Sequence, residues 1–162
     1  MSGRSFEDII APGTPAPEFT LLREDGEPFT RSDLLGGGTT VLVFYPFAFS
    51  PVCTDQLQVY DEVRDELAEQ GATLYGVSCD HSYSQSAFRE RLGVEIDQLS
   101  DWEPKGEASK AFGAWFPSRG CSARALVIVG PDGVVTWSYR APSLGELPGA
   151  NLIFDALAGA AA

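Results

Sequence analysis

The pattern of apolar and polar positions divides the chain into alternating strands and helices. Residues 41–45 form a continuous apolar run rich in β-branched and aromatic residues, which predicts a strand buried on both faces. The run ends at Pro46. Beyond it, apolar residues recur at helical spacing and predict a helix over about residues 51–70, with inward positions at Leu57, Tyr60, Val63 and Leu67. Gly71 is placed to end this helix.

The rest of the chain predicts further elements by the same reasoning. They are a loose lead-in over residues 1–15, a hairpin turning at Glu24-Asp25-Gly26, a helical turn at Ser32-Asp33, a strand over 73–79, a helix over 82–92, a short strand near 99–102, a short helix over 106–112, a hairpin with strands at 125–129 and 134–139, and a last helix over 151–160. In the 82–92 helix we expect Ala87, Phe88 and Leu92 to face inward.

The order of these elements predicts the fold class. Strand–helix–strand–helix, then a hairpin and a last helix, is typical of an α/β sandwich with a mixed central sheet. Parallel crossovers build its first half, and the antiparallel hairpin supplies an edge. This is the thioredoxin-like arrangement. At 162 residues we expect one domain over residues 1–162.

Composition and charge exclude several partners. The net charge is −12 and no cluster of Lys and Arg occurs, which argues against nucleic acid. No run of about 18 or more apolar residues is present, so we expect no membrane span. The first eight residues carry acidic groups and lack the apolar segment of a secretory signal.

The cysteines and the histidine narrow the chemistry further. Three cysteines, an odd and widely spaced set, favour a cytoplasmic protein with redox or catalytic thiols over a disulfide scaffold: Cys53, Cys79 and Cys121. His81 is the only histidine, so any His-rich metal site or His-dependent hydrolase would have to include it. We expect His81 to be a polar loop residue and expect no metal site.

Cys53 lies at the start of the helix that follows the buried strand. Ser50 followed by Pro51 has the pattern of an N-cap and a proline at the first helical position. Cys53 is then the third helical residue, and we expect the Ser50 hydroxyl oxygen to accept its N–H. Unpaired N–H groups and the helix dipole favour the thiolate here, so the sequence predicts a nucleophile. The alternative is an ordinary buried core cysteine.

These residues resemble the signature of the peroxiredoxins: a proline, three residues, Thr or Ser, two residues, and the reactive cysteine. Pro46, Ser50 and Cys53 stand at that spacing, and Arg124 matches a second family element just before a strand. An isolated arginine is otherwise most often a surface salt-bridge partner. The resemblance covers about residues 15–158 and looks closest to the AhpE-type one-cysteine subfamily.

The resemblance implies a thiol-dependent peroxidase that reduces hydrogen peroxide and organic hydroperoxides through a sulfenic acid on Cys53, without a cofactor. Arg124 would stabilise the thiolate and the leaving oxygen, Ser50 would hold the peroxide in line, and Pro46 would shield the thiolate. It also implies a homodimer that associates through the side bearing the Cys53 helix and Trp102. The reductant would be an external thiol or a thioredoxin- or glutaredoxin-like protein.

Two alternative functions and one step of the mechanism stay open at the level of sequence. One alternative function is a thioredoxin-like binding or holdase module with little turnover. Another is thiol–disulfide exchange, which is weakened because Ser50 stands where thioredoxins carry the first cysteine of C-x-x-C. The open step is how the sulfenic acid is reduced after attack. Cys121, in a flexible-looking loop near Arg124, is the candidate resolving thiol, whereas Cys79 is expected to be a small buried residue.

Overall fold

The computed structural model describes residues 8–160. Residues 1–7, the first part of the predicted lead-in and of the segment considered as a secretory signal, lie outside the described residues. The elements in chain order are β1 (Thr20–Arg23), β2 (Pro28–Thr30), the 3-10 helix η1 (Arg31–Leu34), β3 (Thr39–Phe44), α1 (Pro51–Glu62), α2 (Arg64–Glu69), β4 (Ala72–Ser78), α3 (Ser82–Leu92), β5 (Asp97–Ser100), α4 (Glu107–Ala111), β6 (Trp115–Phe116), β7 (Cys121–Ser122), β8 (Ala125–Val129), β9 (Val135–Arg140) and α5 (Ala150–Ala160).

Most predicted elements are confirmed, with two differences. The single helix expected over 51–70 is divided into α1 and α2, because the backbone of Val63 leaves the helical region (φ −105°, ψ 7°). The short β6–β7 hairpin was not predicted, since two-residue strands carry no detectable period. Gly71 and Gly93 both adopt positive φ after their helices, as the sequence indicates for helix stops.

The central sheet is mixed, as predicted. Its seven strands lie in the order β2-β1-β5-β4-β3-β8-β9. β3 pairs parallel with β4 and antiparallel with β8, and β4 pairs parallel with β5. The N-terminal hairpin joins the same sheet through antiparallel pairing of β1 with β5. The structure thus confirms the parallel crossovers and the antiparallel β8–β9 hairpin at one edge, whereas the place of the β1–β2 hairpin at the other edge was not predicted.

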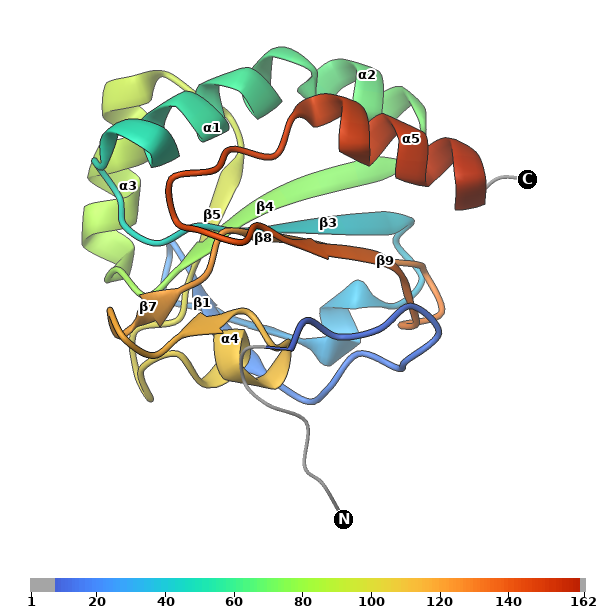
Figure 1. Ribbon diagram of the computed structural model, residues 1–162, viewed down its shortest axis with the longest axis horizontal. Coiled ribbons are helices and arrows are strands. Elements are labelled where there is room, and N and C mark those ends of the chain that lie inside the picture. The colour runs from blue at the N-terminus through green and yellow to red at the C-terminus, as the bar shows by residue number, and fades with distance from the viewer. Residues whose placement is uncertain (1–7, 161–162) are drawn as a thin grey trace.

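Helices cover both faces of the sheet. Figure 1 shows α1, α2 and α5 above the sheet, with α4 below it. Side chains of β3 alternate between the two resulting cores, because successive residues of a strand point to opposite faces. Val41 and Val43 pack with Cys53 on the α1 side, while Leu42 and Phe44 pack with Phe112 on the other.

The inward face of α3 differs from the prediction. Phe88 is fully buried, but Ala87 is exposed and Leu92 is only partly buried. The other buried residues of α3 are polar, Ser82 and Gln85, and an apolar pattern does not identify them. Gln85 is fully buried. Its Nε2 donates to Ser78 Oγ and to the Leu99 carbonyl, both at 2.9 Å. These bonds offset the cost of burying the amide.

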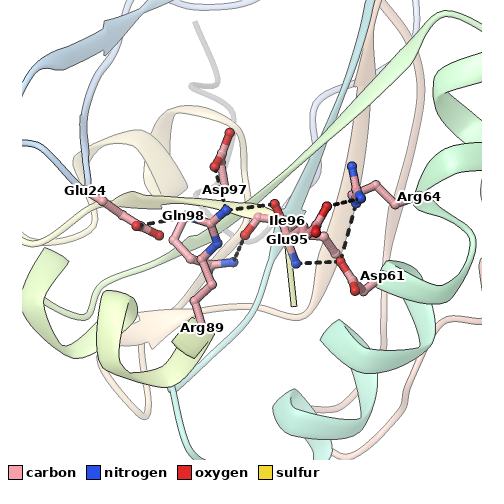
Figure 2. A network of polar contacts seen from close by, with 8 residues as sticks. All are labelled: Glu24, Asp61, Arg64, Arg89, Glu95, Ile96, Asp97 and Gln98. Atoms are coloured by element: carbon pink, nitrogen blue, oxygen red, sulfur yellow. Dashed lines mark hydrogen bonds and ion pairs between the residues drawn. The ribbon is translucent and has the colours of Figure 1, made fainter. Parts of the chain in front are cut away.

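Two arginines connect the helices to the start of β5 (Figure 2). Arg89 of α3 contacts Glu24 at 3.1 Å and Asp97 at 3.2 Å. Arg64 of α2 contacts Glu95, whose N–H donates to Asp61 Oδ1 at 2.8 Å. Because these groups are partly exposed, each pair contributes about 0–1 kcal/mol. They therefore contribute little to the stability of the fold. No helix within residues 8–160 is long and apolar enough to cross a membrane.

Candidate active site

Cys53 occupies the position that the sequence predicts. β3 ends at Phe44, residues 46–50 form a loop, and α1 begins at Pro51, so Cys53 is the third helical residue. Its side chain is fully buried and packs in the core between α1 and the sheet. The first turn of α1 contains no acidic residue, so no carboxylate there opposes a thiolate.

Ser50 is at the N-cap, but its hydroxyl does not cap the helix. Its backbone is extended (φ −72°, ψ 148°) and its carbonyl accepts the N–H of Thr54 at 2.9 Å. The hydroxyl donates instead to the Phe47 carbonyl at 3.0 Å, inside the loop. The expected bond from the Cys53 N–H to the Ser50 oxygen is therefore wrong, because the tight loop offers the hydroxyl a nearer acceptor.

Arg124 lies directly against Cys53, so the surface salt-bridge alternative is wrong. Only 2% of its surface is exposed. Nη2 donates to Cys53 Sγ at 3.2 Å, Nη1 donates to Gln56 Oε1 at 2.5 Å, and Nε donates to the Leu144 carbonyl at 2.9 Å. Among residues 8–160, no ion pair to this guanidinium is found. Its positive charge is therefore directed at the sulfur.

Strand pairing explains how Arg124 reaches this position. β8 runs antiparallel to β3, and Ala125 stands opposite Phe44. Arg124 consequently lies beside the carboxyl end of β3, where the chain turns toward α1. Its carbonyl accepts the N–H of Ala141, so the segment after β9 passes over the same place.

Gln56 and Tyr60 belong to the site and were missed by the sequence analysis. Both are fully buried on the inner face of α1, at three and seven residues after Cys53. Gln56 Nε2 donates to Tyr60 Oη at 3.4 Å, and the Tyr60 hydroxyl donates to the Pro148 carbonyl at 2.5 Å. Burial raises the pKa of Tyr60 to about 12, so it remains a neutral donor. The available signal was a glutamine on the helix face that carries Cys53.

The predicted site residues gather around one open pocket. Pro46, Ser50 and Arg124 line it together with Phe47, Pro51, Val52, Arg119, Leu144 and Gly145. Most of this lining is apolar, and two arginines supply the charge. Cys53 does not line the pocket itself. It lies behind two lining residues: Arg124, which bonds its sulfur, and Val52, its neighbour in the chain.

Cys121 differs from the expectation of a flexible loop residue. It lies in β7, pairs with Phe116 of β6, and is fully buried. Burial, with a smaller contribution from Cys79, raises the pKa of the Cys121 thiol to about 11. Cys79 is a small buried residue as predicted. Its sulfur is 3.5 Å from Ser122 Oγ, and burial raises its thiol pKa as well. Both thiols therefore stay protonated near neutral pH.

The remaining titratable candidates do not extend the site. His81 is the N-cap of α3, where Nδ1 accepts the N–H of Tyr83 at 3.1 Å. In the part of the chain that the structure describes, no group of three His, Cys, Asp or Glu could hold a metal ion. The arrangement that remains is a thiol at a helix start beside a buried guanidinium. It suits attack by sulfur on a bond whose leaving atom gains negative charge.

Comparisons with known proteins agree with this chemistry. The model of the AhpC/TSA family matches residues 12–138. The chain is 31% identical over 152 residues to a thiol peroxidase of Mycobacterium tuberculosis, covering 93% of this chain and 90% of the relative. It is 28% identical over 149 residues to alkyl hydroperoxide reductase E of the same organism, covering 90% and 95%. The crystal structure of Enterococcus faecalis AhpC matches with a TM-score of 0.82 at 25% identity, covering 93% of this chain and 92% of that one.

Proposed function

Because the chain belongs to the AhpC/TSA family of peroxiredoxins, we propose that it reduces hydrogen peroxide and organic hydroperoxides with Cys53 as the attacking thiolate. It is a thiol-dependent peroxidase of thioredoxin-like fold. The observation that supports this assignment most directly is the 3.2 Å contact between Arg124 Nη2 and Cys53 Sγ. A binding or holdase module would have no use for a buried cation beside a buried thiol.

In the proposed step the Cys53 sulfur attacks one peroxide oxygen and the O–O bond breaks. The sulfur loses two electrons and becomes a sulfenic acid, while the second oxygen leaves as hydroxide or alkoxide and takes a proton from solvent. Arg124 stabilises the thiolate before attack and the charge on the leaving oxygen during it. Its contacts to Gln56 and Leu144 hold the guanidinium in position for both.

Ser50 and Pro46 have positioning roles in this proposal. The Ser50 hydroxyl donates to Phe47 and so keeps its lone pairs free to accept a hydrogen bond from the peroxide O–H. Pro46 is buried and lines the pocket beside it. It would exclude water from the thiolate without offering a competing N–H. A peroxide would reach Cys53 through this pocket.

We propose that an external thiol, small or carried by a thioredoxin- or glutaredoxin-like protein, reduces the sulfenic acid. Gln58 stands five residues after Cys53, where a resolving cysteine would lie in the same helix in some relatives. Cys121 is the other candidate, but it is buried in β7 with a raised thiol pKa. A Cys53–Cys121 disulfide would need Cα atoms within about 7 Å and rearrangement of secondary structure.

We also propose a homodimer in the cytoplasm. Exposed aromatic side chains gather on the loop before α1, the start of α3 and the segment after β5: Phe47 (41% exposed), Phe49 (51%), Tyr83 (81%) and Trp102 (51%). The His81 ring links two of them, at 4.9 Å from Tyr83 and 5.7 Å from Trp102. A cytoplasmic location fits three unpaired cysteines. Trp102→Glu should convert the dimer to monomer in sedimentation velocity, whereas Leu35→Glu, at an exposed apolar residue outside this aromatic group, should not.

The test of the function is peroxide consumption at one equivalent. Wild-type protein should lose one thiol rapidly, and peptide mapping should locate the oxidation at Cys53. Cys53→Ser should fold, because serine fills nearly the same volume, and should consume no peroxide. Equal turnover in that variant would remove the assignment.

A further inference from the structure

The loop between β3 and α1 is fastened to the neighbouring strand by one carboxylate. Asp80 follows β4, and its Oδ2 accepts the N–H of Ala48 at 2.8 Å. We propose that Asp80 is a positioning residue for peroxide reduction. By holding Ala48, it fixes the positions of Pro46 and Ser50, which lie in the same loop and line the pocket. This inference rests on the proposed function, because Asp80 acts only through a loop that serves the Cys53 site.

Asp80 is itself held by two serines, one of which is fixed in turn by Gln85. Ser78 Oγ donates to the same Oδ2 at 2.7 Å. Gln85 of α3 donates to Ser78 Oγ at 2.9 Å, and Ser100 of β5 donates to the Asp80 carbonyl at 2.6 Å. The carboxylate therefore has one position relative to the sheet. A group fixed in this way can fix what it binds.

The loop needs such an anchor because its backbone is strained at Phe49. This residue adopts φ +69°, in the left-handed region that residues other than glycine rarely occupy. Such a conformation persists only when its surroundings enforce it. Two contacts do so: the Ala48 N–H bonds Asp80 on one side, and the Phe49 ring packs on Phe88 of α3 at 5.0 Å. Ser50 is the next residue along the chain, so loss of the anchor displaces its hydroxyl.

The geometry separates this effect from stabilisation of the thiolate. Asp80 does not line the pocket, and its bonds reach the loop from β4. Arg124 reaches Cys53 from the start of β8 and is held by Gln56 and Leu144. None of these three bonds involves Asp80. Removing the Asp80 carboxylate should therefore slow peroxide attack and leave the thiolate fraction of Cys53 nearly unchanged.

The experiment is a double-mutant cycle on the rate constant of peroxide attack. Asp80→Ala should slow attack roughly ten- to a hundredfold, because small misplacement of a positioning group costs rate in that range. Ser50→Ala should also slow attack, and the double variant should be little slower than the slower single variant. Asp80→Asn keeps an oxygen that can accept the Ala48 N–H and should restore most of the rate. The ultraviolet absorbance of the thiolate should match wild type in all four variants.

Two controls make the outcome decisive. Ser84→Ala, at an exposed position of α3, leaves every bond of Asp80 named above in place and should react as wild type does. If Asp80→Ala does not fold, Asp80→Glu, which moves the carboxylate by one methylene, takes its place in the cycle. An unchanged attack rate, or a loss that adds fully to that of Ser50→Ala, would overturn the inference. Peroxide consumption by wild type and Ser84→Ala would show that the peroxidase function stands even then.

Discussion

Arg124 donates a hydrogen bond to Cys53 Sγ at 3.2 Å, although 71 positions of sequence separate the two residues. Both side chains are buried. A buried guanidinium is costly unless its N–H groups are bonded, and the Gln56 and Leu144 oxygens satisfy two of them. The third direction is left for the sulfur. The fold therefore maintains a cation beside the thiol before any substrate arrives.

Removing this cation should affect both the thiolate and the leaving oxygen. Arg124→Ala is expected to lower the thiolate fraction of Cys53 at neutral pH and to slow peroxide attack by ~10²–10³. Arg124→Lys should recover part of the rate, because it keeps the charge but not the fixed fork of donors. Stopped-flow oxidation and thiolate absorbance measure the two effects. Unchanged values in Arg124→Ala would exclude a catalytic role for this residue.

Gln56 should matter through Arg124. Gln56→Ala removes the acceptor of Arg124 Nη1 and the partner of Tyr60. We expect peroxide attack to slow by about tenfold, the equivalent of one hydrogen bond, and less than in Arg124→Ala. Gln58→Ala is the matched control, since Gln58 is exposed on the same helix and should react as wild type does. Equal rates in the two glutamine variants would contradict the prediction.

Peroxide-treated protein should stop at the sulfenic acid when no external thiol is present. Intact mass should show a gain of one oxygen, and Cys121→Ser should behave identically, because Cys121 is buried in β7. Excess peroxide should then drive Cys53 on to the sulfinic acid. If the mass instead shows loss of two hydrogens, and peptide mapping joins Cys53 to Cys121, the internal thiol resolves the intermediate after all.

The raised thiol pKa of Cys121 predicts a loss of stability at alkaline pH. In the folded protein this pKa is about 11, whereas an unfolded thiol titrates about two units lower. Between these values the unfolded chain binds fewer protons than the folded one, so the free energy of unfolding falls as pH rises. In urea unfolding from pH 9 to 11, the free energy of unfolding should fall more steeply with pH for wild type than for Cys121→Ala. The difference in slope should correspond to the release of about one proton on unfolding. Parallel curves would contradict it.

The kinds of elements, most of their bounds and the place of Cys53 follow from local sequence patterns. These depend on short-range patterns: an apolar run, a proline that ends it, and helical spacing after Pro51. The same local rules failed wherever a side chain had a choice of partners. Ser50 was predicted to cap α1, but its hydroxyl bonds Phe47, because two acceptable hydrogen bonds differ little in free energy and the loop geometry decides between them.

Which distant residues meet depends instead on how the sheet is assembled. Antiparallel pairing of β8 with β3 brings Arg124 to Cys53, and parallel pairing of β4 with β3 brings Asp80 to Ala48. The burial of Cys121 is likewise a tertiary feature, because β7 pairs with β6 and lies against β4. Strand register is set by the whole sheet and its two cores, not by any local window of sequence. For that reason the nucleophile could be predicted from its own neighbourhood, whereas its partners could be assigned only by family resemblance until the sheet was assembled.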